Sequence, residues 1–191
     1  MPTVVAERTL HRFNVAEYAA MIRHGILTDR DRVELIAGEI VEMPPSNPPH
    51  AGSVTFLHCF FCTALGRTAT VASQQTLEIP PHAMLQPDLM LLAWRDDFYR
   101  ARRIRPQDVL LVVEVADASL HYDRTTKVRL YAHAGVPECW VVDLSGKAVE
   151  LHGEPRDDRY TGVRVARGND LIAPAAFPDC RTSVKEILGA C

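Results

Sequence analysis

The sequence contains few cysteines, and their number is odd: five in 191 residues. An odd, scattered set argues against a framework of paired disulfides. Cys59 and Cys62 form a C-x-x-C in the segment HCFFC, and no second C-x-x-C accompanies them. Two hypotheses remain for this pair. It is either a redox pair or half of a zinc site, or simply two buried thiols on one face of a helix, which we favour.

The sequence also lacks a long apolar run and a strong positive charge. No apolar stretch approaches the roughly 20 residues that span a bilayer, so we expect no membrane partner. The first residues, MPTVVAERTLHRF, lack the basic-then-apolar pattern of a secretory signal, and we therefore expect a cytoplasmic protein. The formal net charge is −3, which excludes the general basic character of many nucleic-acid-binding domains.

Positive charge is nevertheless concentrated locally, in the segment RDDFYRARRIRP at 95–106. Five guanidiniums this close together are expected either to hold phosphates or to form a solvated loop. As candidate phosphate-binding residues we name Arg100, Arg102 and Arg103.

The order of the expected elements predicts an α/β fold with a mixed sheet flanked by helices. The length suits one domain over 1–191, with a core at about 11–188. A strand–helix–strand unit at 109–144 fits a right-handed crossover. We expect a helix from the Asn14 cap to Gly25, two short strands within 33–43, a break at 44–49, a buried helix at 50–66, strands at 70–79, 87–94, 109–116 and 137–144, a helix at 122–135 capped by Asp123, C-terminal hairpin strands at 147–152 and 160–166, and a short closing helix.

Two carboxylates in apolar strands are the first candidates for chemistry. Asp88 follows Pro87 at the start of one strand, and Glu114 interrupts the aliphatic run VLLVVEVA at 109–116. An ionised carboxylate in such a run is costly without a partner. If the two strands are neighbours, both acids lie at one edge of the sheet and suit a shared Mg²⁺ or Mn²⁺ ion.

Lys127 is the candidate cation, since it lies in the first turns of the helix that follows Glu114. Lys127 and Tyr131 are four residues apart and share a helix face. A lysine here is expected to orient a water or to stabilise negative charge on a phosphate. Simpler hypotheses also exist: Asp88 caps a turn, Lys127 is solvated, and Glu114 forms a structural salt bridge with Arg129 or Lys127.

Together these residues resemble a known motif, P-D followed by E-x-K, except that Ala116 occupies the position of the lysine. In some branches of the PD-(D/E)xK nuclease superfamily the lysine lies on the adjacent helix, where Lys127 is placed. The chain resembles the Uma family of restriction-endonuclease-like proteins from about residue 11 to 188. The resemblance is carried by RVELIAGEIVEMPPSNPPH, QPDLMLL, DVLLVVEVADASLHYDRTTKVRLYAHAGVPECWVVDL and a late Y…G…L…FP.

This resemblance implies a restriction-endonuclease-like fold and Mg²⁺-dependent nuclease chemistry. It implies that Asp88 and Glu114 bind the metal and that Lys127 is catalytic, with Glu34 as an upstream acid. Gln74 or Gln75 is expected to line the site, and His50 to contact substrate or to cap the long helix. We expect DNA cleavage, most simply by a homodimer acting on both strands. The alternative is a catalytically inactive nucleic-acid-binding or interaction module on the same fold.

Overall fold

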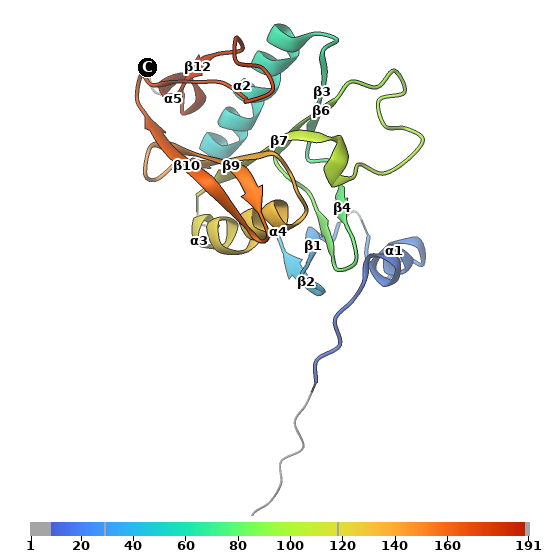
Figure 1. Cartoon of the computed structure of the whole chain (residues 1–191). Helices are drawn as coiled ribbons and strands as arrows, with labels where there is room; N and C mark the ends of the chain where they lie inside the picture. Colours follow the sequence, from blue (N-terminus) through green and yellow to red (C-terminus); the bar gives the residue numbers. More distant parts are fainter. Residues whose placement is uncertain (1–8, 29, 118, 190–191) are drawn as a thin grey trace, which may run out of the picture.

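The computed structural model describes residues 9–28, 30–117 and 119–189, and its centre is a six-stranded mixed sheet (Figure 1). The strand order is β10-β9-β8-β7-β6-β3. β7 and β8 are parallel, as the predicted strand–helix–strand unit requires, and the other neighbours are antiparallel. The strands are β3 (Ala69–Ser73), β6 (Leu89–Ala93), β7 (Val109–Ala116), β8 (Glu138–Asp143), β9 (Ala148–Arg156) and β10 (Arg159–Arg167).

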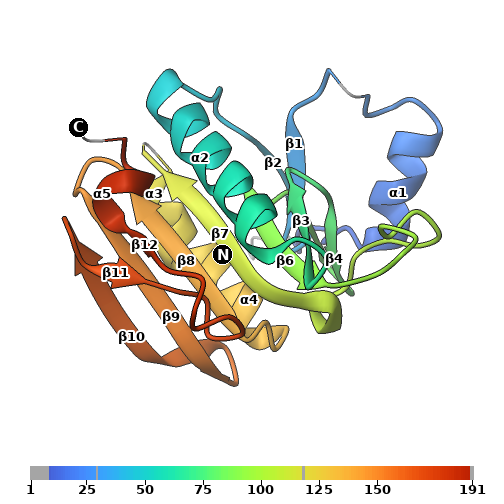
Figure 2. The ribbon, with the colours of Figure 1, turned by 90° about the horizontal axis from the view of Figure 1, so that it is seen from above.

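Strand β7 is apolar apart from Glu114, because helices cover both faces of the sheet (Figure 2). Successive side chains of a strand point to opposite faces. Leu111, Val113 and Val115 therefore belong to one buried cluster, while Val112 and Ala116 belong to the other. The first face is covered by α2 (Pro48–Leu65) and α5 (Val184–Ile187), and the second by α3 (Leu120–Tyr122), the π-helical η2 (Asp123–Lys127) and α4 (Val128–His133).

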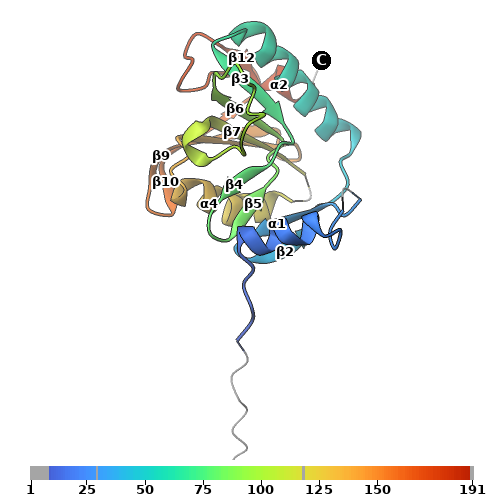
Figure 3. The ribbon, with the colours of Figure 1, turned by 90° about the vertical axis from the view of Figure 1, so that its right-hand side faces the viewer.

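A second, four-stranded sheet lies at one end of the molecule together with α1 (Figure 3). Its strands are antiparallel, and Tyr18 packs on Leu35 and Met84 to form a small separate core. The Tyr18 hydroxyl donates to the carbonyl of Val33 at 2.9 Å, which fixes the helix on the sheet. The elements are α1 (Val15–Arg23) and, in sheet order, β2 (Glu39–Glu42), β1 (Val33–Ile36), β5 (Ala83–Leu85) and β4 (Leu77–Ile79).

The remaining described elements are short. η1 (Pro106–Asp108) is one turn of 3₁₀-helix directly before β7, and β11 (Leu171–Ile172) pairs with β12 (Thr182–Ser183). Among the described residues, none of the helices combines the length and the apolarity needed to cross a bilayer.

The predicted mixed α/β architecture and the predicted C-terminal hairpin are confirmed, and so are several local features. Asn14 caps α1 by accepting from the backbone N–H groups of Ala16 and Glu17, while Glu17 accepts from the Asn14 N–H at 2.8 Å. Gly25 follows the helix with a φ of +70°, a left-handed conformation that suits glycine. These features depend on neighbouring residues alone, which is why the sequence reveals them.

The predicted strand at 70–79 is wrong, because the segment divides between the two sheets as β3 and β4. Gln74 breaks it with a φ of +52°. The Gln74 N–H donates to the carbonyls of Pro87, at 3.1 Å, and Asp88, at 3.3 Å. These bonds attach the end of β3 to the turn that holds Asp88. The short strand β5 was not predicted.

The long helix also differs from the prediction, since α2 begins at Pro48, inside the expected break. Proline fits the first helical turn because the N–H it lacks has no partner there. Only one stripe of the helix is buried, and it contains Leu57 and Phe61. Cys59 and Cys62 are exposed, so the hypothesis of two buried thiols is wrong.

Candidate active site

Glu114 meets a tyrosine and a lysine. It lies on the same face of β7 as Val112 and Ala116, the face covered by α4, and only 3% of it is exposed. The Tyr131 hydroxyl donates to Glu114 Oε1 at 2.5 Å, and Lys127 Nζ lies 3.4 Å from the same oxygen. Burial raises the pKa of Glu114, and the neighbouring acids Asp88, Asp123 and Glu34 add to this, while the Lys127 charge opposes it.

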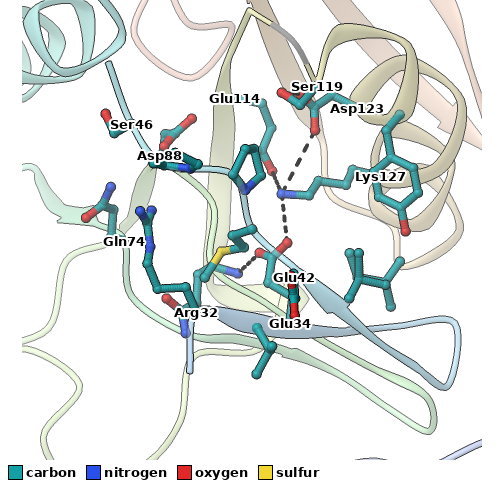
Figure 4. A pocket seen from close by; sticks show the side chains of 18 of the residues that line it. Arg32, Glu34, Glu42, Ser46, Gln74, Asp88, Glu114, Ser119, Asp123 and Lys127 are labelled. Carbon is teal, nitrogen blue, oxygen red and sulfur yellow. Dashed lines mark hydrogen bonds and ion pairs between the residues drawn. The ribbon is translucent and has the colours of Figure 1, made fainter. Parts of the chain in front are cut away.

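Lys127 is the centre of a group of carboxylates. Its Nζ lies 3.0 Å from Glu34 Oε2, 3.4 Å from Glu114 Oε1 and 4.0 Å from Asp123 Oδ1 (Figure 4). Burial by itself would lower the pKa of Lys127, but the charges of Glu114, Glu34 and Asp123 outweigh it and raise the pKa.

Glu34 connects the small sheet to the helical segment that carries Lys127. It lies on β1 and is 2% exposed. Its Oε1 accepts from the backbone N–H of Gln86 at 2.5 Å, while Oε2 pairs with Lys127. The structure thus brings the predicted upstream acid into the same cluster as Glu114.

Asp88 enters the site through strand pairing. Leu89 of β6 lies opposite Val113 of β7, so the preceding residue, Asp88, is placed beside Glu114. Asp88 Oδ2 accepts from the Val115 N–H at 2.8 Å and lies 3.1 Å from His50 Nε2. The predicted convergence of the two acidic strands is therefore present.

His50 is held on both sides of its ring. Its Nδ1 lies 2.9 Å from the Ser46 hydroxyl, and its Nε2 contacts Asp88. The hydrogen bond to Asp88 raises the pKa of His50, against the effect of burial. Helix α2 is capped instead by Asn47, whose side chain accepts from the His50 N–H at 3.0 Å, so the hypothesis that His50 caps the helix is wrong.

Asp123 has a different position from the one predicted. It is not an N-cap, because the helical segment already begins at Leu120 and continues through η2. Its Oδ2 accepts from the Ser119 hydroxyl at 2.6 Å, and burial raises its pKa. Sequence reasoning missed Asp123 as a site residue, although its i,i+4 spacing from Lys127 is a signal that places both on one helix face.

These residues line one pocket of about 520 Å³ between the two sheets. Its lining is strongly acidic, with Lys127 and Arg32 as the permanently charged cations. Negative potential of this kind attracts divalent cations and repels phosphates. The carboxylates are Asp31, Glu34, Glu42, Asp88, Glu114, Asp117 and Asp123.

The donor set fits a hard cation. Across the described residues, no group of three or more His, Cys, Asp or Glu side chains is arranged to hold a metal ion. Asp88 and Glu114, which lie side by side, supply carboxylate oxygens, and Mg²⁺ commonly binds through one or two carboxylates and retains several waters. The pocket therefore fits Mg²⁺ or Mn²⁺ better than an ion that requires a complete protein cage.

The predicted phosphate-binding arginines do not line this pocket. Arg102 makes two hydrogen bonds of 2.6 Å to Asp108, and Arg103 lies 3.5 Å from Glu78. Arg100 lies over the Phe98 ring. Arg102 and Arg103 are thus paired with acids from η1 and β4. Gln74 lines the pocket, whereas Gln75 does not.

The mixed sheet flanked by helices is the α/β architecture expected of a restriction-endonuclease-like protein, and Asp88, Glu114 and Lys127 lie together in its pocket. The model of the family Uma2, described as "Putative restriction endonuclease", matches residues 15–185, and the chain belongs to this family.

A solved structure supports the fold. It is described as "a putative nuclease belonging to DUF820 from Anabaena variabilis ATCC 29413". The match has a TM-score of 0.73 and covers 92% of this chain and 97% of the other, at 14% sequence identity. At this identity the likeness shows a shared fold. No curated protein matches the chain significantly.

Proposed function

We propose that the chain is a Mg²⁺- or Mn²⁺-dependent endonuclease that hydrolyses phosphodiester bonds in DNA. The observation that carries the proposal is the Lys127 ammonium, which lies within 3.4 Å of both Glu34 and Glu114, in the pocket that Asp88 also lines. A family of restriction-endonuclease-like proteins makes nucleic acid the natural substrate class. In this proposal Lys127 takes the role of the lysine that the E-x-K motif lacks at Ala116, and its contact with Glu114 supports this.

Asp88 and Glu114 are the proposed metal ligands. A bound divalent ion would polarise a phosphate oxygen and lower the pKa of water. The acidic lining supports this part of the proposal. The negative charge of the pocket repels a phosphodiester, and a bound cation would reduce that charge. Glu34 serves a different purpose, since it already holds Lys127 at 3.0 Å.

Lys127 acts in this proposal as a fixed positive charge. Its raised pKa keeps the ammonium protonated, so it is suited to balance charge that develops on the phosphate and unsuited to accept a proton. Glu34 and Asp123 orient it, and Tyr131 orients Glu114.

The substrate and assembly follow from the same reasoning. We propose double-stranded DNA as substrate and a homodimer as the active assembly, because two equivalent sites cut two strands most simply. In the arginine-rich loop, Arg100 is the candidate for phosphate contact, since Arg102 and Arg103 are paired with acids.

A plasmid-nicking assay in Mg²⁺ and in Mn²⁺ tests the proposal. Asp88→Asn, Glu114→Gln and Lys127→Met are each expected to lower the nicking rate at least a hundredfold, the scale of a lost electrostatic contact to the transition state. Asp179→Asn and Lys185→Met, which change exposed residues outside the pocket, are matched controls and should nick as the wild type does.

Equal nicking by the wild type and by Asp88→Asn would remove the assigned site. DNA binding without metal-dependent nicking in the wild type would favour the alternative, a catalytically inactive nucleic-acid-binding module. Two features favour this alternative: the acidic lining of the pocket, and Ala116 at the position of the motif lysine.

A further inference from the structure

Arg32 is a cation of the acidic pocket that the proposed chemistry does not use. It directly precedes β1, is exposed, and lines the pocket together with Gln74 and Asp88. Figure 4 shows its side chain extending toward the side of the pocket where these two residues lie. The ion pairs found between described residues do not include Arg32, although carboxylates surround the pocket.

The other cationic groups of the pocket already have partners. Lys127 lies between Glu34 and Glu114, and His50 is held by Asp88 and the Ser46 hydroxyl. Within the described parts of the chain, Arg32 is thus the pocket-lining cation that keeps its charge for a ligand.

The start of helix α2 explains why an anion here requires a side chain. Asn47 and His50 of this helix terminus line the pocket. The first two helical residues, Pro48 and Pro49, have no N–H, and the His50 N–H already donates to the Asn47 side chain. The terminus therefore contributes the positive end of its dipole but few free donors. A guanidinium supplies the missing donors, in a planar arrangement that suits phosphate oxygens.

We propose that Arg32 binds the non-bridging oxygens of the phosphodiester that enters this pocket, on the side away from Lys127. Figure 4 places Arg32 and Asp88 on one side of the cavity and Lys127 on the other, with Glu114 next to Lys127. A phosphate between the two cations lies against the acids that are proposed to bind the metal. This inference rests on the proposed function and names the residue that holds its substrate.

Binding of a short fluorescein-labelled DNA duplex, followed by fluorescence anisotropy in Ca²⁺ over a series of KCl concentrations, tests the inference. Arg32→Gln is expected to raise the Kd about tenfold and to reduce the slope of log K against log salt by about one, the loss of one phosphate contact. Arg32→Lys should be intermediate, because it keeps the charge and loses the planar fork.

Two matched variants complete the experiment. Arg30→Gln removes an exposed arginine two residues away that does not line the pocket, and should bind as the wild type does. Arg100→Gln tests the arginine-rich loop. The inference is overturned if Arg32→Gln has the Kd and salt slope of Arg30→Gln, and a loss confined to Arg100→Gln would assign the phosphate contact to the loop.

Failure of this inference is separable from failure of the proposed function. If Asp88→Asn abolishes nicking while Arg32→Gln binds DNA normally, the result supports the nuclease proposal and contradicts the proposed role of Arg32. If the wild type never nicks plasmid while Arg32→Gln weakens binding, Arg32 is a phosphate contact of a binding module.

Discussion

At the residue scale, the site depends on the charge balance around Lys127. Its side chain is 11% exposed, and the side chains of its partners Glu34 and Glu114 are 2% and 4% exposed. Burying a charged group costs free energy because the group loses its hydration. If one partner of a buried ion pair is removed, the remaining charge stays buried without an opposite charge beside it.

Lys127→Met should therefore lower the free energy of unfolding by about 3 to 5 kcal/mol, measured by urea denaturation at neutral pH. Lys185→Met is the matched control, since it removes an exposed lysine, and a change within about 0.5 kcal/mol is expected. Similar effects of the two substitutions would mean that the cluster is solvated in solution.

Tyr131 offers a second test at this scale. Its hydroxyl donates to the buried Glu114, so Tyr131→Phe should cost about 1 to 3 kcal/mol by urea denaturation, because a buried carboxyl oxygen loses a donor. Tyr160→Phe is the comparison, since Tyr160 donates to the Val136 carbonyl at 2.9 Å. Tyr160→Phe should cost less, about 1 kcal/mol, and the reverse order would contradict the assigned role of Tyr131.

At the element scale, the short η2 segment carries both Lys127 and Asp123 and requires an anchor. Arg124 provides it by contacting Asp143, at 3.0 Å, and Glu150 on the neighbouring strands β8 and β9. π-helical turns are rare and occur often at functional sites. This one is held in place by a charged contact to the sheet.

Arg124→Gln should lower the free energy of unfolding by about 1 to 2 kcal/mol and reduce nicking, because the helical segment that carries Lys127 loses its attachment to the sheet. Arg129, in the following helix α4, forms an exposed ion pair with Asp158. Arg129→Gln breaks this pair and should change the free energy of unfolding by less than about 0.5 kcal/mol. Urea denaturation and the nicking assay provide the two measurements. An unchanged nicking rate in Arg124→Gln would show that the anchor does not position Lys127.

The turn η1 gives a prediction about pH. The hydrogen bonds from Arg102, assisted by the Arg105 N–H, lower the pKa of Asp108 below its ordinary value, against the effect of burial. A carboxyl group with a lowered pKa stabilises the fold above its unfolded pKa of about 4, and this contribution is lost as the pH falls through the lower folded value.

Asp108→Asn should consequently destabilise the protein by about 2 kcal/mol at pH 7 and by clearly less near pH 3. Urea denaturation of both proteins at the two pH values measures the difference. The exposed Asp179→Asn is the control, with little change at either pH. A pH-independent loss in Asp108→Asn would indicate that packing, and not the charge, is responsible.

The element scale also shows what the sequence can reveal. The Asn14 cap and the apolar strand with Glu114 depend on local pattern, and both were predicted. The break at Gln74 was not, because it depends on bonds to Pro87 and Asp88 from another part of the fold. Asp123 resembles an N-cap in sequence, but Ser119 and Lys127 hold it within the helix.

The candidate site also has features that the sequence predicts and features that it does not. The pairing of Asp88 with Glu114 and the reach of Lys127 follow from strand order and helix spacing, and were predicted. The predicted phosphate-binding role of the arginine-rich loop stays a prediction. Arg102 and Arg103 pair with Asp108 and Glu78, and Asp108, only six residues from Arg102, was visible in the sequence. Arg32 has no distinguishing local pattern, and only the meeting of the two sheets places it in the pocket.

At the scale of the whole molecule, the pocket is the junction of the two sheets. Glu34 comes from the small sheet, whereas Glu114 and Asp88 come from the large sheet and its edge. We therefore propose that residues 1–191 unfold as one domain. A ligand that binds only the folded state raises stability by RT ln(1 + [L]/Kd).

Mn²⁺ at about a hundred times its Kd should stabilise the wild type by about 2.7 kcal/mol and raise Tm by roughly 5 to 10 °C in a single transition. Asp88→Asn should lose most of this shift, whereas Asp179→Asn should retain it. Differential scanning calorimetry measures both the shift and the number of transitions. Equal shifts in Tm for Asp88→Asn and Asp179→Asn would mean that the metal binds elsewhere. Two transitions would contradict unfolding as one domain.

The separation of Glu34 and Lys127 along the chain has a consequence for biosynthesis. Glu34 is synthesised before Asp88 and Glu114, and its ammonium partner Lys127 follows all three. A nascent polypeptide therefore exposes unassembled carboxylates and no completed cavity. Whatever reaction this cavity performs is therefore withheld until the segment with Lys127 has been translated and has folded against Glu34.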